Sequence, residues 1–164
     1  MTHVERPNST QLARPRMAAA IVLSTFLLFL SCNVPAVSGD AATEVESALT
    51  QWMSDFNAGK TDRVCDLFAT DVRADFRGYP TRDHQAVCDL LLKSLTNKSR
   101  AFRYALDIKE IVVFGDMAVV RLVWTLTIKE KGGGEFKSVE PGMDVFQRQA
   151  DGSWKIVRYM AYEE

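Results

Sequence analysis

Residues 118–128 constrain the fold more than any other segment. Apolar side chains occupy every second position there, at Ala118, Val120, Leu122, Trp124, Leu126 and Ile128. A period of two is typical of a β-strand with one face toward a core. Gly115-Asp116, a two-residue turn signal, joins this run to a second alternating run at 102–114. The segment therefore predicts a long antiparallel hairpin.

The remaining patterns predict an α+β domain. Residues 135–149 and 153–162 predict two more strands, the first with a bulge or bend near Pro141-Gly142. Apolar residues at helical spacing predict helices at 41–58, 61–68 and 82–95, and alternation predicts a short strand at 71–78. We therefore expect three N-terminal helices packed on a long, curved antiparallel sheet that forms a cone-shaped pocket.

The first 39 residues have the composition of a secretory signal peptide. Arg6, Arg14 and Arg16 precede an uncharged apolar run at 17–30, and small residues between Ala36 and Asp40 offer a cleavage site. This layout predicts a signal peptide at 1–39, which is cleaved, and an exported domain at 40–164, periplasmic or secreted. The alternative is a membrane anchor through residues 17–37.

Charge and composition exclude several partners of the mature domain. Removal of residues 1–39 lowers Lys+Arg from 20 to 17 and Asp+Glu from 21 to 20, so the net charge becomes about −3. We therefore expect no nucleic-acid partner and, after signal cleavage, no membrane partner. His84 is the only histidine left, so a histidine-rich metal site is excluded. We expect neither a metal nor a cofactor.

Two cysteines stay in the mature domain. Cys65 and Cys88 lie on the core-facing sides of two predicted helices. An even number of cysteines in an exported chain favours a disulfide, and the alternative is a pair of reduced, buried thiols. A nucleophilic cysteine has little support, because His84 is the sole candidate base and precedes Cys88 by one turn.

Three stretches resemble the nuclear-transport-factor-2-like superfamily, in its SnoaL-like and ketosteroid-isomerase-like branches. They are "FNAGKTDRVCDLFATDV", "MAVVRLVW" and "DVFQRQADGSWKIVRY", and the resemblance extends over residues 41–162. It implies the cone-shaped fold. It does not imply a single activity, because this fold includes isomerases, dehydratases, cyclases and binding modules.

The resemblance also implies which side chains face the pocket. These are Trp52, Phe68, Ala74, Phe76, Val120, Leu122, Trp124, Met143, Val145, Val157, Tyr159 and Ala161. The isomerase needs a tyrosine, a base and a second acid. In this sequence those roles fall on Trp52, Phe76 and Pro141, so none is filled by its usual residue. Asp75 and Glu140 are the neighbouring carboxylates, and either would need a bulge to point inward.

These observations leave three functional hypotheses. The first is an exported domain that binds a small apolar ligand without catalysis. The second is a cofactor-free isomerase or lyase with Asp75 or Glu140 as its base. The third is a dimeric interaction module. A homodimer through the sheet is expected, because Met117, Val119 and Val123 make its outer face too apolar for full exposure to water.

Overall fold

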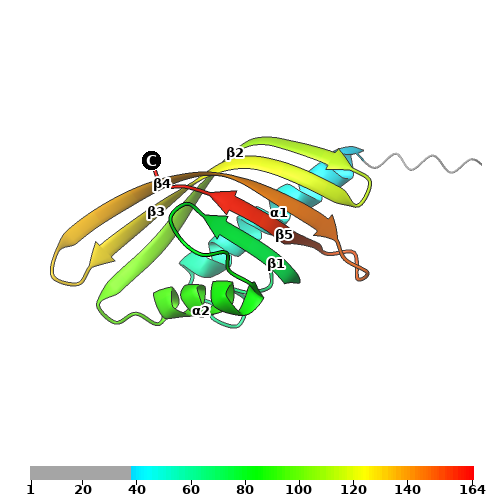
Figure 1. Ribbon diagram of the computed structural model, residues 1–164. Coiled ribbons are helices and arrows are strands. Elements are labelled where there is room, and N and C mark those ends of the chain that lie inside the picture. Colours follow the sequence, from blue (N-terminus) through cyan, green and yellow to red (C-terminus); the bar gives the residue numbers. More distant parts are fainter. Residues whose placement is uncertain (1–37) are drawn as a thin grey trace, which may run out of the picture. The chain divides into compact units, whose positions relative to one another are not determined.

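A computed structural model describes residues 38–164, with side chains from residue 41 onward. Residues 1–37 lie outside it, and they hold the anchor alternative and nearly all of the predicted signal peptide. The described elements follow one another as α1, β1, α2, β2, β3, β4 and β5 (Figure 1). No helix among them combines the length and apolarity needed to cross a membrane.

Five strands form one sheet in the order β1-β5-β4-β3-β2. They are β1 (Phe68–Phe76), β2 (Arg100–Phe114), β3 (Met117–Glu130), β4 (Gly134–Arg148) and β5 (Trp154–Ala161). The strands from β2 to β5 pair antiparallel as predicted, whereas β1 pairs parallel with β5. The sheet is therefore mixed. No hairpin joins the first strand to the last, so no tight turn dictates their relative direction.

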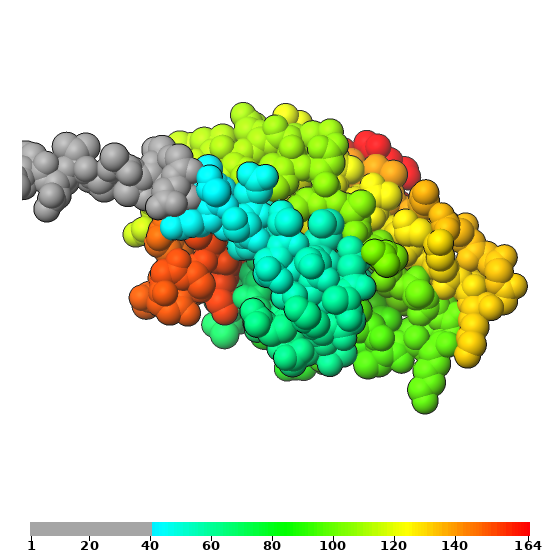
Figure 2. Space-filling model, turned by 180° about the vertical axis from the view of Figure 1, so that it is seen from behind, coloured from blue at the N-terminus to red at the C-terminus, as the bar shows by residue number. Residues whose placement is uncertain are grey.

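Both helices pack on one face of this sheet. α1 (Ser38–Asn57) buries a stripe at Val45, Leu49, Trp52 and Phe56, as its helical spacing predicts. Gly59, at φ 73°, takes the left-handed conformation that ends the helix. Seen from behind, α1 crosses the described surface beside the orange residues of the β4–β5 turn (Figure 2). α2 (His84–Leu95) begins at Asp83, whose side chain accepts a hydrogen bond from the Ala86 amide at 3.0 Å.

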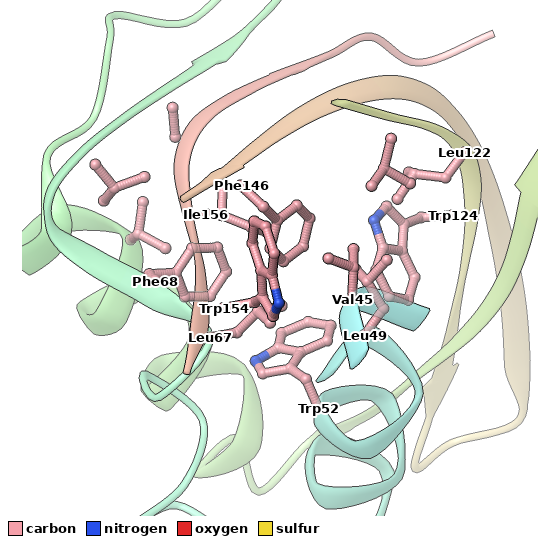
Figure 3. Close-up of a cluster of buried hydrophobic side chains, with 14 of the residues drawn as sticks. Val45, Leu49, Trp52, Leu67, Phe68, Leu122, Trp124, Phe146, Trp154 and Ile156 are labelled. Carbon is pink, nitrogen blue, oxygen red and sulfur yellow. The ribbon is translucent and has the colours of Figure 1, made fainter. Parts of the chain in front are cut away.

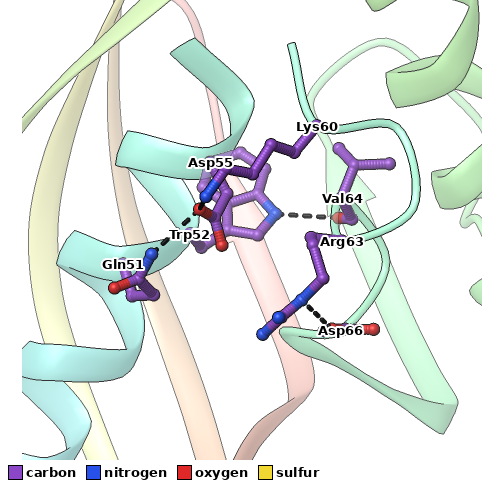
Figure 4. Close-up of polar contacts among 7 residues, drawn as sticks. All are labelled: Gln51, Trp52, Asp55, Lys60, Arg63, Val64 and Asp66. Atoms are coloured by element: carbon purple, nitrogen blue, oxygen red, sulfur yellow. Dashed lines mark hydrogen bonds and ion pairs between the residues drawn. The ribbon is translucent and has the colours of Figure 1, made fainter. Parts of the chain in front are cut away.

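Residues 60–67 form a series of turns where the sequence predicts a second helix. Their backbone hydrogen bonds span three residues, as from Arg63 N to Lys60 O and from Asp66 N to Arg63 O. Two side-chain contacts fix this short segment to α1 (Figure 4). Trp52 Nε1 donates to Val64 O at 2.8 Å, and Lys60 Nζ pairs with Asp55 at 2.8 Å. These tertiary contacts thus favour a series of backbone turns here. A helix over 61–68 would have been only about two helical turns long and therefore weakly stable on its own.

The hydrophobic core lies between α1 and the inner face of the sheet (Figure 3). On β3, Ala118, Val120, Leu122 and Trp124 are buried, and the residues between them face outward, as the alternation predicts. Their partners across the sheet include Phe146 of β4 and Ile156 of β5.

The predicted bulge near Pro141-Gly142 is absent. Pro141 pairs with Val123 and Gly142 with Leu122 in unbroken register. Instead, β4 pairs with β5 irregularly at Val157, which has no partner between the Val145–Arg158 and Phe146–Ile156 pairs. Gly142 allows the backbone of β5 to lie close to β4, because an added Cβ would lie 2.9 Å from the Met160 carbonyl oxygen. A regular β4 therefore keeps one set of alternate residues on the inner face.

Candidate functional site

A cavity of about 380 Å³ lies beneath the sheet, and part of the hydrophobic core forms its wall. α1 contributes Trp52 to its wall, and α2 contributes Val87, Leu90 and Leu91. The strands provide the remaining wall, and Tyr79 lies on the loop between β1 and α2. Apolar and aromatic side chains dominate this lining. Its volume and composition are those of a site for a small organic molecule.

Six of the twelve residues predicted to face the pocket lie in this wall. They are Trp52, Phe68, Ala74, Phe76, Trp124 and Tyr159. Trp52 and Trp124 contact each other with ring centroids 5.4 Å apart, and Tyr104 lies 5.5 Å from Trp124. The sequence did not single out Tyr104, although its inward position on β2 follows from the alternation of residues 102–108. The aromatic residues thus form one connected wall.

The other six residues predicted for the pocket lie elsewhere. Val145 belongs to the odd-numbered, outer face of β4, and Ala161 is buried at the end of β5 without lining the cavity. Val120 and Leu122 are buried among the core side chains under α1 and do not reach the cavity. Val157 is the unpaired residue of the bulge and does not line the cavity either, although it is buried. Met143 is 48% exposed on the outer face of the sheet. The prediction for Met143 is wrong because β4 carries apolar residues on both faces.

The inward-facing residues of β4 are the even-numbered ones. Ser138, Glu140 and Asp144 all line the cavity. Glu140 therefore points inward without a bulge. Asp75 lies on the exposed face of β1, and its carboxylate accepts a hydrogen bond from the Thr81 hydroxyl. Of the two carboxylates predicted as a base, only Glu140 reaches the cavity.

Asp144 is the acid that the sequence prediction missed. Its side chain is fully buried, and neither carboxylate oxygen has a hydrogen-bond partner among the described residues. This burial raises the pKa of Asp144 to about 8 from an ordinary value of 3.8. The carboxyl is therefore mostly protonated at neutral pH, and it ionises when the pH rises by about one unit. A correct assignment of the two faces of β4 would have revealed it.

Tyr159 lies directly across the β4–β5 ladder from Asp144. The bulge at Val157 sets this position, because Trp154 and Ile156 face inward before it and Tyr159 faces inward after it. Burial raises the pKa of Tyr159 well above its usual value, and the nearby Asp144 raises it further. Burial likewise raises the pKa of Tyr104. Both phenols are therefore neutral hydrogen-bond donors in the cavity wall.

Glu140 provides a second acid on the same strand. Glu140 is 7% exposed, and its cross-strand neighbour on β3 is Trp124. Burial raises the pKa of Glu140, a hydrogen bond from Ser138 lowers it, and the charge of Glu163 raises it. The site thus holds two carboxyl groups whose surroundings favour the protonated form.

The indole of Trp52 is not available as a donor to a ligand. Its Nε1–H already donates to the Val64 carbonyl at 2.8 Å (Figure 4). In the isomerase pattern a tyrosine occupies this position and donates to the substrate. Here Trp52 contributes an aromatic surface only, and the donors of the cavity are Tyr104 and Tyr159 instead.

A disulfide joins Cys65 and Cys88, as the sequence predicts, with 5.5 Å between their Cα atoms. It connects the turn segment 60–67 to α2, and both elements contribute side chains to the cavity wall. His84 lies beside Cys88, with its ring nitrogens 3.8 Å from the sulfur. The disulfide therefore holds part of the wall and is not a nucleophile. In the described part of the chain, no group of three or more potential ligands could hold a metal ion.

Comparison with protein families gives one match. The model of the SnoaL-like domain matches residues 49–159, which include α2 and the cavity-lining parts of the strands. A search of curated proteins finds none with significant sequence similarity.

Several solved structures have a similar fold. A ketosteroid isomerase-like protein from Erwinia carotovora atroseptica aligns with a TM-score of 0.63 and 22% identity, over 76% of this chain and 96% of that one. ActVI-ORFA from Streptomyces coelicolor aligns with a TM-score of 0.63 and 13% identity, over 76% and 98%. An NTF2-like protein with a cystatin-like fold from Novosphingobium aromaticivorans aligns with a TM-score of 0.61 and 17% identity, over 74% and 80%. At these identities the likeness establishes the fold alone.

Proposed function

The chain belongs to the SnoaL-like family, and from the geometry of its cavity we propose that it catalyses proton transfer on a small, mostly apolar substrate, with Asp144 as general acid–base. This is the isomerase or lyase hypothesis, with Asp144 as the base in place of Asp75 or Glu140. The unpartnered, buried carboxyl of Asp144 in the cavity wall is the observation that carries it. The apolar run at 17–30 supports the further proposal that the domain works after export.

Asp144 has the properties that proton transfer requires. A general acid–base works best when its pKa lies near the working pH, and burial brings the pKa of Asp144 to about 8. The ionised carboxylate would take a proton from a carbon next to a carbonyl group of the substrate. The carbonyl oxygen would then carry the negative charge. The protonated carboxyl would return the proton at the same or another atom.

Tyr159 is suited to stabilise that charge. It lies across the ladder from Asp144, and its raised pKa keeps its hydroxyl protonated. A neutral phenol in a water-poor cavity donates a strong hydrogen bond to a developing oxyanion. The mostly apolar lining of the cavity lowers the local dielectric constant and strengthens this interaction.

The test is exchange of carbon-bound hydrogen with deuterated water. Enolisable cyclic ketones small enough for the cavity are incubated with the protein, and proton loss is followed by NMR. Exchange should rise with pH and level off above about 8, because the carboxylate of Asp144 is the base. Asp144→Asn should lower the rate by roughly 10²–10⁴-fold, the usual contribution of a general base.

Asp75→Asn is the matched control. It removes one of the two carboxylates that the sequence suggested as the base, and this group lies on the exposed face of β1. The variant should exchange at the wild-type rate. Equal rates in wild type and Asp144→Asn, or no exchange with ketones that demonstrably bind, would contradict the proposal.

Binding without catalysis is the second candidate. Neither carboxylate oxygen of Asp144 is accessible to solvent, and most of the cavity lining is apolar. A protein of this kind would bind the same ketones with no exchange above the buffer rate. Binding and exchange measured on one sample separate the two functions.

A further inference from the structure

Two acidic residues lie near each other in one wall of the cavity. Glu140 lies on β4, and Glu163 follows the end of β5. The two segments run side by side, because Tyr162 N donates to Pro141 O at 3.3 Å and Glu164 N donates to Val139 O at 3.0 Å. The charge of Glu163 is close enough to raise the pKa of Glu140. These two carboxylates therefore act on the same part of the cavity.

The carboxylates of this wall have no ion-pair partner in the described chain, although Arg77 donates a hydrogen bond to the backbone carbonyl of Glu163 at 3.2 Å. No ion pair found in residues 41–164 includes Glu140, Asp144 or Glu163. Arg82 is the one cation among the residues that line the cavity. Its guanidinium lies over the ring of Tyr79, 5.1 Å from the centroid, on the loop between β1 and α2. A buried carboxylate without an ion-pair partner is costly when it is ionised, and a cationic ligand would reduce that cost.

The surface next to Glu140 also suits a cation. Trp124 is the cross-strand neighbour of Glu140, and its ring belongs to the wall formed with Trp52 and Tyr104. Aromatic faces attract ammonium groups, and tryptophan does so most strongly. The body of such a ligand would lie on apolar side chains. Asp144, unpartnered and fully buried, independently indicates that the ligand brings a polar group to the other end.

We propose that the ligand of this cavity is an elongated apolar amine, whose protonated nitrogen lies between Glu140 and Glu163 and whose far end meets Asp144. Glu140 and Asp144 are four residues apart on one strand, which corresponds to roughly 13 Å at about 3.3 Å per residue. The substrate of the proposed reaction is then a molecule of about that length, with a carbonyl or hydroxyl group opposite the amine. This inference names the substrate class of the proposed function and rests on it.

The experiment compares three probes of similar shape: phenylbutylammonium, phenylbutanol and phenylbutyrate. Their affinities for the protein are measured by calorimetry at neutral pH. The ammonium should bind at least roughly tenfold more tightly than the alcohol, the factor typical of a hydrogen bond to a charged group. The carboxylate should bind more weakly than both. Equal affinities of ammonium and alcohol, or no saturable binding of either, would overturn the inference.

Variants then locate the preference. Glu140→Gln should abolish the advantage of the ammonium over the alcohol and leave the affinity for the alcohol unchanged. Glu163→Gln changes an exposed residue, and it should reduce the same advantage even if Glu140→Gln fails to fold. Glu135→Gln is the control, because Glu135 pairs with Lys129 and does not line this cavity. An advantage that persists in both Glu163→Gln and the Glu140→Gln, Glu163→Gln double variant would contradict the proposal.

The two proposals fail in different ways. Hydrogen exchange that depends on Asp144, without a preference for the ammonium, refutes the amine and leaves the catalyst. A preference for the ammonium that depends on Glu140, without exchange, refutes the catalyst and leaves an amine-binding protein.

Discussion

At the scale of single residues, Asp144 is the main exception to the rule that buried polar groups form hydrogen bonds. Buried polar groups almost always have a hydrogen-bond partner, and neither oxygen of this carboxyl has one in the described chain. Its neighbours provide no cation, and burial alone raises its pKa to about 8. Such a group costs stability, and we interpret its presence as functional.

The free energy of unfolding should record this cost as a function of pH. The folded pKa of Asp144 is about 8 and its ordinary value is 3.8, so between these values the folded state binds more protons than the unfolded state. Stability should therefore fall as the pH rises through this window, by an amount on the order of a few kcal/mol. Urea denaturation at several pH values measures it.

Asp144→Asn should flatten this profile, because an amide does not titrate. Above about pH 8 the variant should be more stable than the wild type, since it carries no buried charge there. A variant whose stability falls with pH as steeply as that of the wild type would assign the dependence to another group. Asp75→Asn, on the exposed face of β1, should keep the wild-type profile.

At the scale of elements, α2 packs less extensively on the rest of the domain than the other elements of the cavity wall do. It buries Val87, Cys88 and Leu91, and it exposes 46% of Leu90 at the cavity. The disulfide to Cys65 connects it to the turn segment 60–67, which α1 holds in turn through Trp52. The position of the helix therefore depends on a covalent bond as well as on packing.

Loss of the disulfide should destabilise the domain and loosen α2. The bond closes a loop with a sequence separation of 23 residues, which corresponds to roughly 3 kcal/mol in the chain-entropy estimate. The Cys65→Ser, Cys88→Ser double variant should unfold at a lower urea concentration, and the amides of α2 should exchange faster with deuterium. Mass spectrometry of the native protein without reductant should find no free thiol at either cysteine. An unchanged unfolding midpoint would show that packing alone holds α2.

At the scale of the whole molecule, the outer face of the sheet carries more apolar surface than a solvated face usually does. Met143 and Met160 are paired across β4 and β5 and are 48% and 64% exposed. Val139 and Tyr162 beside them are 37% and 41% exposed. Contiguous patches of this kind mark contact sites. We propose that two copies of the domain pack through this face.

Met143→Glu should therefore convert a dimer into a monomer. A charge in the centre of an apolar interface loses its hydration without gaining a partner, whereas on a free surface it would cost little. Light scattering over a range of concentrations measures the mass of both proteins. Asp75→Asn, which leaves this patch unchanged, should stay dimeric, and a wild-type monomer at high micromolar concentration would refute the proposal.

The sequence by itself determined the order of the five strands and of α1 and α2, the buried stripe of α1 and the inner face of β3, and it favoured the disulfide between the two cysteines. For α1 and for β3 one periodic pattern was sufficient, because Leu49 and Trp52, or Val120 and Leu122, fall on a single apolar face. The family resemblance extended this to the fold class and to six of the twelve side chains predicted to face the pocket, which lie in its wall.

Only the tertiary structure decided the orientation of β4, and with it the chemistry of the cavity. β4 has Met143 and Val145 on one face and Phe146 on the other, so its apolar pattern is compatible with either face being inside. Its register with β3 resolves this, because pairing with a strand of known orientation places Glu140 and Asp144 beneath the sheet. The bulge at Val157 then brings Tyr159 opposite Asp144. These features depend on contacts between strands, and periodicity within one strand does not encode them.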